Sequence, residues 1–365
     1  STGWGDAICV IPLVLHDHDA HRDIVAEALP AMEKWNDFVW SISNGPVVRP
    51  PKEWGARGFT FGDWLQPVGG KWPLEKPFRT IGDDASATIY LYISTTMTAR
   101  AARIVGDTAL AKRMDDRAIA VRAAFVDEFV TPSGRLLYDD QTSYALAILH
   151  GLIPPDLLPA ASAFFKATIA RSDGRIGTGF IGTPALLPAL LKIGEPSLAA
   201  AVFLQEKIPG WLYQVKTGAT TIWERWDAIG EDGKAFDPQM NSYNHYAYGA
   251  VCQWLFEAVA GFRPDPEAPG FAHIIFEPLI IPQLSPVKAH HDSRAGRIEA
   301  NWVLDGNTAT YTVTVPSGAR GTLLLSPYYT NAVVDGKPLA SPAGKEKARS
   351  LLAPGVHTIT FRISR

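Results

Sequence analysis

The hydrophobic residues of this chain change their spacing once, near residues 262–270, and this change constrains the fold more than any other feature. Before it, apolar residues recur at helical spacing, and Pro or Gly interrupts the pattern every one or two dozen residues. After it, the period becomes two, as in residues 308–315, where Thr alternates with Ala, Tyr or Val. The sequence therefore predicts a helical domain over residues 1–262 and a separate β domain over residues 263–365.

The helical domain is predicted to be layered. Its clearest helices are expected at residues 6–16, 21–42, 84–105, 107–130, 140–151, 157–171, 183–193, 196–207 and 240–260. Asp107 suits the N-cap of the fourth helix, and Asn241 or Ser242 is expected to begin the last. The helices at 183–193 and 196–207 are apolar on several sides, which favours an inner layer. Paired helices joined by long loops rich in Gly, Pro and Trp, at 44–82, 172–182 and 208–239, are typical of an α/α toroid.

The β domain is predicted to be an antiparallel β-sandwich. Short stretches with strand character are separated by turn residues, at 308–315, 321–325, 332–337 and 356–361.

Composition excludes several classes of protein. With 47% hydrophobic and 19% charged residues, the chain is expected to be folded and water-soluble. A net charge of -3 gives no basic surface for nucleic acid. No apolar run reaches the roughly 20 residues that a membrane span needs. Neither a C-x-x-C nor an H-E-x-x-H pattern suggests zinc, and Cys9 and Cys252 are predicted to be buried free thiols.

The segment 218–227 concentrates the chemistry of a carbohydrate site. Glu224 could transfer a proton, Arg225 could hold it ionised, and Trp223 or Trp226 could offer a flat apolar face to a pyranose ring. The alternative is a core strand or turn in which Glu224 and Arg225 form a surface ion pair. The two interpretations differ in whether the carboxylate is available as a base.

Further motifs follow one another along the helical domain. They are Gly3-Trp4-Gly5-Asp6-Ala7, Phe61-Gly62-Asp63-Trp64-Leu65, Asp140-Gln141-Thr142-Ser143-Tyr144-Ala145-Leu146, Thr178-Gly179-Phe180-Ile181-Gly182-Thr183-Pro184, Gly210-Trp211-Leu212-Tyr213 and, after the Glu224 segment, Ser242-Tyr243-Asn244-His245-Tyr246-Ala247-Tyr248-Gly249. In this order the chain resembles the C-terminal portion of the bacterial α-L-rhamnosidases of glycoside hydrolase family 78. The resemblance implies an (α/α)6 toroid, incomplete at its N-terminus, followed by a β-sandwich.

The resemblance also implies a reaction. It is the hydrolysis of terminal α-L-rhamnosides in glycosides or polysaccharides, with inversion at the anomeric carbon and without a metal or organic cofactor. Inversion uses two carboxyl groups about 6.5–9.5 Å apart. The family's general base aligns with Glu224. Its general acid lies in an Asp-x-x-Arg-x-Glu-Arg type motif before the Gly3 segment, which nothing in this chain matches, so we expect an N-terminal segment of the same protein to supply the acid and the chain alone to be inactive.

Six residues are predicted to bind the sugar: Asp6, Asp63, Trp64, Trp223, Trp226 and His245. For the two Asp residues, which stand beside Trp and Gly, the alternative role is helix capping. For the three Trp residues, which could cover the C6 methyl face of rhamnose, it is core packing. His245 could hydrogen-bond a hydroxyl, and its alternative is a structural role.

Other pairs of ionisable residues are predicted to be structural. Asp83-Asp84 and Asp139-Asp140 suit helix N-termini, where the helix dipole stabilises negative charge. His290-His291 is expected on a surface turn of the β domain.

Three functions remain open from sequence. The first is the base-bearing part of an inverting α-L-rhamnosidase. The second is another glycosidase with the same toroid, such as a glucoamylase-like or trehalase-like hydrolase, because a fold alone does not fix function. The third is a non-catalytic carbohydrate-binding remnant. The start at Ser1 looks internal, which leaves the bacterial cytoplasm, the periplasm and the cell exterior open as compartments.

Overall fold

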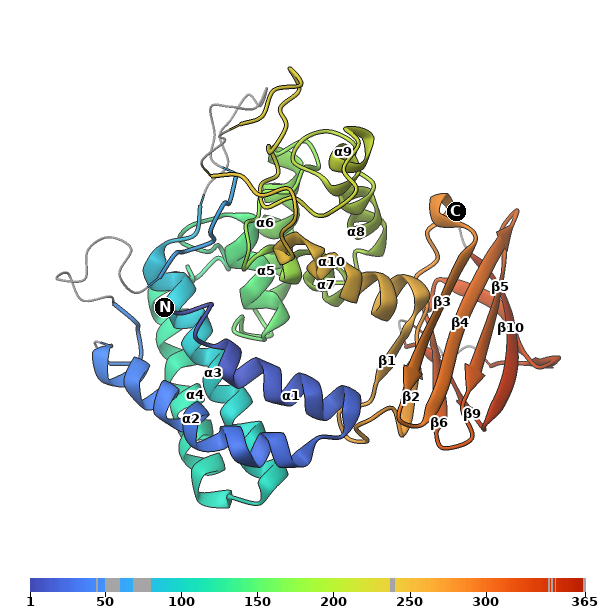
Figure 1. The fold of residues 1–365 in the computed structure, drawn as a ribbon, viewed down its shortest axis with the longest axis horizontal. Coiled ribbons are helices and arrows are strands. Elements are labelled where there is room, and N and C mark those ends of the chain that lie inside the picture. The colour runs from blue at the N-terminus through green and yellow to red at the C-terminus, as the bar shows by residue number, and fades with distance from the viewer. Residues whose placement is uncertain are drawn as a thin grey trace. The chain divides into compact units, whose positions relative to one another are not determined.

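The computed structural model describes residues 1–43, 45–49, 60–67, 80–236, 240–340, 342, 344 and 346–363 (Figure 1). The chain forms two compact units. The first combines Ser1–Ile11 with Ala26–Val251, and the second combines Pro12–Val25 with Cys252–Arg365. Helices make up the first unit and strands dominate the second, so the predicted order of a helical region before a β region is confirmed. A domain boundary at 262/263 stays a prediction.

The helices before residue 207 begin and end within a few residues of their predicted positions. They are α1 (Ala7–Asp19), α2 (Arg22–Ile42), α3 (Asp83–Val105), α4 (Thr108–Phe129), α5 (Gln141–Leu149), α6 (Leu158–Arg171), α7 (Thr183–Lys192) and α8 (Pro196–Phe203). Asp107 caps α4 as expected, since its side chain accepts the Leu110 N–H at 2.9 Å. Asp140 caps α5 through the N–H groups of Thr142 and Ser143.

The acidic residues that neighbour Asp84 and Asp140 differ in their roles. Asp83 begins α3 as predicted, whereas Asp139 pairs with Arg135 and Arg171.

Helices α3, α5 and α7 form an inner series in which each contacts the next, while α4, α6 and α8 pack on α3, α5 and α7 respectively (Figure 1). Sequence explains this layering, because α5 buries every residue from Gln141 to Ile148 and α7 is buried on most sides. The expected inner position of residues 196–207 is wrong. Helix α8 ends at Phe203, packs on α7 and exposes Ala201, since small alanine side chains bury little apolar surface.

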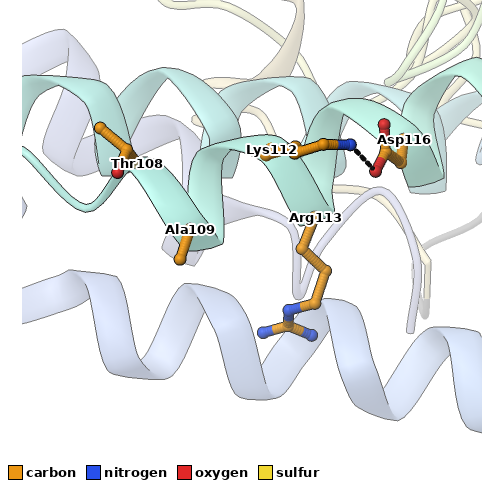
Figure 2. Close-up of a pocket in the computed structure, with 5 residues that line it drawn as sticks. All are labelled: Thr108, Ala109, Lys112, Arg113 and Asp116. Carbon is orange, nitrogen blue, oxygen red and sulfur yellow. Dashed lines mark hydrogen bonds and ion pairs between the residues drawn. The ribbon is translucent and has the colours of Figure 1, made fainter.

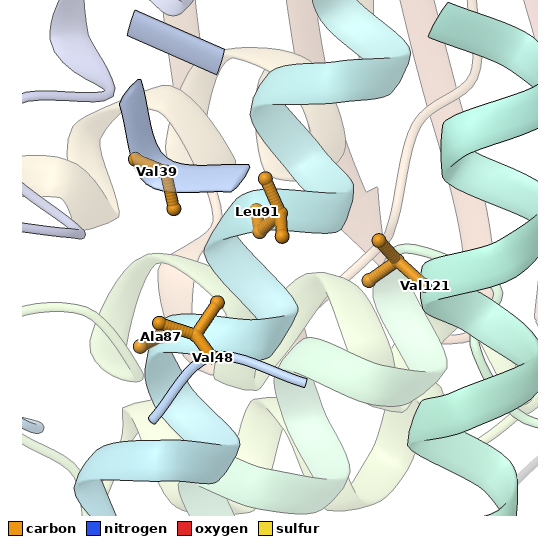
Figure 3. Packing of buried hydrophobic residues seen from close by; sticks show 5 residues of the cluster. All are labelled: Val39, Val48, Ala87, Leu91 and Val121. Atoms are coloured by element: carbon orange, nitrogen blue, oxygen red, sulfur yellow. The ribbon is translucent and has the colours of Figure 1, made fainter. Parts of the chain in front are cut away.

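Small apolar side chains hold the first helices together. Val39 of α2, Ala87 and Leu91 of α3, and Val121 of α4 are fully buried with Val48 in one cluster (Figure 3). Such small side chains let the helix axes approach closely. The cluster therefore joins α3 to α2 and α4.

Two predictions for residues 208–260 are wrong. The expected loop 208–239 contains α9 (Trp211–Lys216). The expected helix 240–260 begins only at residue 247, and it comprises the 3-10 helix η2 (Ala247–Ala250), α10 (Val251–Trp254) and the π-helix η3 (Leu255–Ala260). Neither Asn241 nor Ser242 caps it. Residues 242–245 instead run beside residues 222–224, and they carry the site described below.

The second unit contains two sheets. One has the order β1 (Phe262–Pro264), β2 (His273–Phe276), β6 (Arg320–Leu325), β9 (Ala348–Leu352), and the other has the order β3 (Val287–Ser293), β4 (Gly296–Asp305), β5 (Thr308–Val315), β10 (Gly355–Ile363), β7 (Tyr329–Val334), β8 (Lys337–Pro338). All pairings are antiparallel except that of β2 with β6. The sandwich-like β region is therefore as predicted, with one parallel pair inside it.

Three details of this unit differ from expectation. The predicted strand 332–337 is a hairpin, because Asp335 and Gly336 adopt φ of 49° and 77° and so form the two-residue turn between β7 and β8. His290 and His291 lie within β3 rather than on a turn. Both cysteines are free and Cys9 is buried, but Cys252 is exposed.

Candidate active site

Glu224 is held by a short stretch of paired backbone. Its N–H donates to the Ser242 carbonyl at 2.9 Å, and the Ser242 N–H donates to Glu224 Oε2 at 2.9 Å. Glu224 is half-buried, and within the described residues no donor bonds to Oε1. The carboxylate is thus oriented by one oxygen and open through the other.

Arg225 does not pair with Glu224. Its guanidinium bonds to Asp227 at 3.0 and 3.3 Å and lies 3.9 Å from the centre of the Phe236 ring. The Glu224–Arg225 ion pair, considered both as an aid to ionisation and as a purely structural alternative, is therefore wrong. The cause is local geometry. The Arg225 side chain turns toward Asp227, two residues further on, whereas the Glu224 carboxylate accepts the Ser242 N–H.

His245 lies on the segment that pairs with the Glu224 segment. Its backbone N–H donates to the Ile222 carbonyl at 2.8 Å, and its imidazole Nδ1 accepts the Ala247 N–H at 3.2 Å. The imidazole contacts the ring of Phe180, at 5.0 Å between ring centres, and stacks with the ring of Tyr246, at 5.5 Å. Its Nε2 bonds to no group in the part of the chain that the structure describes, so it is available to a ligand hydroxyl.

Trp223 and Trp226 are enclosed in the helical unit rather than presented to solvent. Both are almost fully buried. Trp226 donates its indole N–H to the Thr178 carbonyl at 2.9 Å and stacks on Tyr248 at 3.9 Å between ring centres. These contacts favour the core-packing alternative for the two rings, because their faces are already covered by protein.

Trp64 differs from them, since it is half-buried and meets Phe61 edge to face at 5.7 Å. Phe61 in turn meets Trp4 at 4.9 Å and is 42% exposed. These rings leave accessible apolar surface close to the Asp63 and Asp6 segments.

Asp6 and Asp63 are buried and bonded to protein groups. Asp6 accepts the Gly3 N–H at 2.7 Å and the Trp35 indole N–H at 2.8 Å. Asp63 accepts the N–H groups of Gly179, Ile181 and Gly182 and the hydroxyl of Thr142. Burial raises the pKa of both carboxyls, and the hydrogen bonds oppose that rise. The two residues behave as internal anchors, which is close to the capping alternative.

A third buried carboxyl lies near Asp63. Burial raises the pKa of Asp140 to about 6, and the negative charge of Asp63 adds to this rise, while bonds to Ser143 and Thr142 lower it. Because Asp140 accepts only groups of the helix that it caps, it serves as a local contrast to Asp63.

Sequence reasoning missed three residues that connect these segments. Thr142, Phe180 and Tyr248 lie inside the sequence motifs 140–146, 178–184 and 242–249. Membership of these motifs is the only feature of the sequence that indicates a role for them in the site. Tyr248 donates to the Leu65 carbonyl at 3.2 Å and receives the edge of Phe180 at 5.4 Å, so it links segments 183 residues apart.

A separate hollow of about 680 Å³ lies on α4, lined by Thr108, Ala109, Lys112, Arg113 and Asp116 (Figure 2). Lys112 pairs with Asp116, and Arg113 pairs with Glu33 and Asp37 of α2. Since these cations are already neutralised, the hollow offers little to an anionic ligand.

Within the described residues, no group of three or more His, Cys, Asp or Glu side chains is arranged to hold a metal ion. None of the helices described there has the length and apolar character needed to cross a membrane.

Two family models match the chain. Residues 1–259 match the bacterial alpha-L-rhamnosidase 6 hairpin glycosidase domain, and residues 261–338 match the bacterial alpha-L-rhamnosidase C-terminal domain.

Curated relatives give the same result. An alpha-L-rhamnosidase of Streptomyces avermitilis is 33% identical over 314 residues, covering 86% of this chain and 28% of that protein. An alpha-L-rhamnosidase of Alteromonas sp. (strain LOR) is 31% identical over 330 residues, covering 87% of this chain and 34% of that protein. The chain thus spans about a third of the length of these relatives.

Solved structures agree over almost the whole chain. The crystal structure of the Streptomyces avermitilis alpha-L-rhamnosidase complexed with L-rhamnose matches with a TM-score of 0.87 and 29% identity, over 99% of this chain and 33% of that one. The native Aspergillus terreus enzyme matches with a TM-score of 0.85 and 27% identity, over 98% and 39%.

Proposed function

Because this chain belongs to the bacterial α-L-rhamnosidase family, we propose that the protein containing it hydrolyses terminal α-L-rhamnosides, with Glu224 as the general base. One observation carries the assignment of the base. Ser242 fixes one oxygen of a half-buried carboxylate, and the other oxygen bonds to no described donor. An oriented carboxylate with a free oxygen is what abstraction of a proton from water requires.

In the proposed reaction the sugar is inverted in one displacement. A water molecule held by Glu224 Oε1 attacks the anomeric carbon and gives its proton to the carboxylate. The bond from that carbon to the leaving oxygen breaks, and a general acid protonates the oxygen on the opposite face. The first product is β-L-rhamnose.

The acid is proposed to come from a part of the intact protein outside these 365 residues. The buried carboxylates of the site region support this idea, since Asp6 and Asp63 accept protein donors on both oxygens and Asp227 is paired with Arg225. A general acid needs a proton directed at the substrate, and these groups are directed into the protein.

For substrate contact we propose Trp64 and His245. Trp64 is half-buried, and His245 Nε2 bonds to none of the described residues. We assign Asp6, Asp63, Trp223 and Trp226 to support of the site from within the protein, in place of the direct sugar contacts predicted from sequence.

The stereochemistry of the product and chemical rescue test this proposal on the intact protein. Proton NMR of the first turnovers on an aryl α-L-rhamnoside is expected to show β-L-rhamnose before mutarotation. In Glu224→Ala, sodium azide is expected to restore turnover and to yield β-L-rhamnosyl azide, because the small anion replaces the water and needs no base.

Three outcomes would contradict the proposal. Initial release of α-L-rhamnose would exclude inversion. Activity on α-glucosides but not on rhamnosides would favour a different toroid glycosidase. Binding of L-rhamnose without turnover would favour a carbohydrate-binding protein.

A further inference from the structure

Asp63 joins three segments that are distant in sequence. Its Oδ1 accepts the N–H groups of Ile181 at 2.9 Å and Gly182 at 3.0 Å, while its Oδ2 accepts the Gly179 N–H at 2.6 Å and the Thr142 hydroxyl. The donors lie 79 to 119 residues away along the chain. Four donors on two oxygens leave the side chain, which is 7% exposed, little capacity for a sugar hydroxyl.

The loop that Asp63 binds is fitted to it closely. A Cβ atom at Gly182 would clash with Thr142 Oγ1 and lie 2.8 Å from Asp63 Oδ2. A Cβ atom at Gly179 would lie 2.6 Å from the Asp63 carbonyl and would clash with that of Trp64. Only glycine permits this approach, so the two glycines and the carboxylate form one arrangement. The Phe180 N–H, which donates to the Trp64 carbonyl at 2.9 Å, completes it.

The same loop supports both sides of the Glu224 segment. The Thr178 carbonyl receives the indole N–H of Trp226, two residues after Glu224. The Phe180 ring packs on His245, which lies on the segment paired with residues 222–224. A shift of residues 178–182 would therefore move both the base segment and the histidine.

We propose that Asp63 is a positioning residue, which fixes loop 178–182 so that Thr178 and Phe180 hold Trp226 and His245 in place around Glu224. This inference rests on the proposed function for its effect on turnover. Asp63 acts on catalysis through the loop and does not touch the sugar. A carboxylate is required, because an amide offers one acceptor oxygen and turns an NH2 group toward backbone donors.

The test compares Asp63→Asn with Asp140→Asn in the intact protein. Asp140 is also a buried carboxylate, at the N-terminus of the helix whose Thr142 hydroxyl bonds to Asp63, but the groups that Asp140 accepts all belong to α5. Four quantities are measured: kcat and KM on an aryl α-L-rhamnoside, the Kd of free L-rhamnose by calorimetry, and the ¹⁹F NMR signal of Trp226 in protein labelled with 5-fluorotryptophan. Loss of one resonance in Trp226→Phe assigns that signal.

Asp63→Asn is expected to lower kcat by at least about tenfold, to change the Kd of rhamnose less than about threefold and to shift the Trp226 signal. Asp140→Asn is expected to leave kcat within about twofold and the Trp226 signal in place, whatever it does to the melting temperature. A tenfold or greater rise in Kd with unchanged kcat in Asp63→Asn would overturn the proposal in favour of direct sugar contact. Equal effects of the two variants on kcat and on the Trp226 signal would overturn it in favour of a general loss of stability.

The fluorine signal separates this inference from the proposed function. If the wild-type protein hydrolyses no rhamnoside, the proposed function fails. The positioning role then stands on a Trp226 shift confined to Asp63→Asn, and an unshifted signal overturns it.

Discussion

Ser242 donates its N–H to Oε2 of Glu224 at 2.9 Å, and its carbonyl accepts the Glu224 N–H at the same distance. One residue thus fixes both the backbone and the carboxylate of Glu224, across a separation of 18 residues. Because no donor among the described residues bonds to the second carboxylate oxygen, the pairing restricts orientation without occupying that oxygen. The backbone N–H of His245 bonds to the Ile222 carbonyl, which keeps His245 beside the Glu224 segment.

The first prediction concerns the base. Glu224→Gln is expected to lower kcat by about 10²- to 10⁴-fold, since the amide keeps the shape but cannot accept a proton. The melting temperature should stay close to that of the wild type, because the amide oxygen can still accept the Ser242 N–H. Steady-state kinetics and calorimetry measure the two effects.

Glu231→Gln is the control for this change, since Glu231 is an exposed carboxylate seven residues further along the same loop. Its activity should match the wild type. A decrease of less than about tenfold in Glu224→Gln, equivalent to about 1.4 kcal/mol, would make Glu224 a structural residue.

Sequence predicts those features of the fold that depend on near neighbours. Asp107 and Asp140 cap their helices because a side chain needs only the N–H groups two or three residues ahead. The dipeptide Asp335-Gly336 is likewise a local signal, since Asp-Gly is a preferred two-residue hairpin turn. The predicted strand 332–337 nevertheless continues across this dipeptide.

The site could be predicted only in part, because its geometry depends on distant pairings. Glu224 and His245 could be picked out as candidates, but the contact that orients Glu224 lies at Ser242, within a stretch expected to be helical. Residues 242–245 are not helical, and Ser242 and His245 bond through their backbones to Glu224 and Ile222. Likewise, nothing local shows that the donors to Asp63 lie more than 110 residues away in the 179–182 loop.

The second prediction concerns stability. Trp226→Phe keeps an aromatic ring against Tyr248 but leaves the buried Thr178 carbonyl without its donor. The free energy of unfolding is expected to fall by about 1–3 kcal/mol, the cost of an unsatisfied buried polar group. Urea denaturation measures it. Trp40→Phe is a suitable comparison, because no described group bonds to the Trp40 indole N–H, and an equal loss there would show that ring size rather than the hydrogen bond matters.

The third prediction concerns pH. Burial lowers the pKa of His150 to about 4, and the charge of Lys192 adds to this effect. In the unfolded chain, His150 has its ordinary pKa near 6.5 and is protonated between pH 6.5 and 4. In the folded chain, His150 stays neutral over the same range, so protonation favours unfolding. Stability is expected to fall by about 1–3 kcal/mol as the pH drops through this window.

Denaturation of the wild type and of His150→Gln at pH 7 and pH 4.5 measures how much His150 contributes to the pH dependence of the free energy of unfolding. The variant should lose less stability between the two values than the wild type does. An identical loss in both proteins would show that other groups govern the pH dependence.

The last prediction concerns substrates with more than one ring. Tyr246 is 87% exposed, and its ring lies parallel to His245, with 7° between the planes. A large aromatic ring held open to solvent beside the site is a surface on which the ring attached to the rhamnosyl unit can stack. Tyr246→Ala is expected to raise KM for rhamnosyl disaccharides by about 2- to 10-fold, which corresponds to about 0.5–1.5 kcal/mol of stacking. Its affinity for free L-rhamnose should not change.

Tyr328→Ala, which removes a ring 55% exposed in the β unit, controls for the loss of surface aromatic area. Equal KM values for Tyr246→Ala and the wild type on disaccharides would remove Tyr246 from the binding surface, and a parallel rise in the Kd of free rhamnose would instead assign it to the His245 contact with the rhamnosyl unit itself.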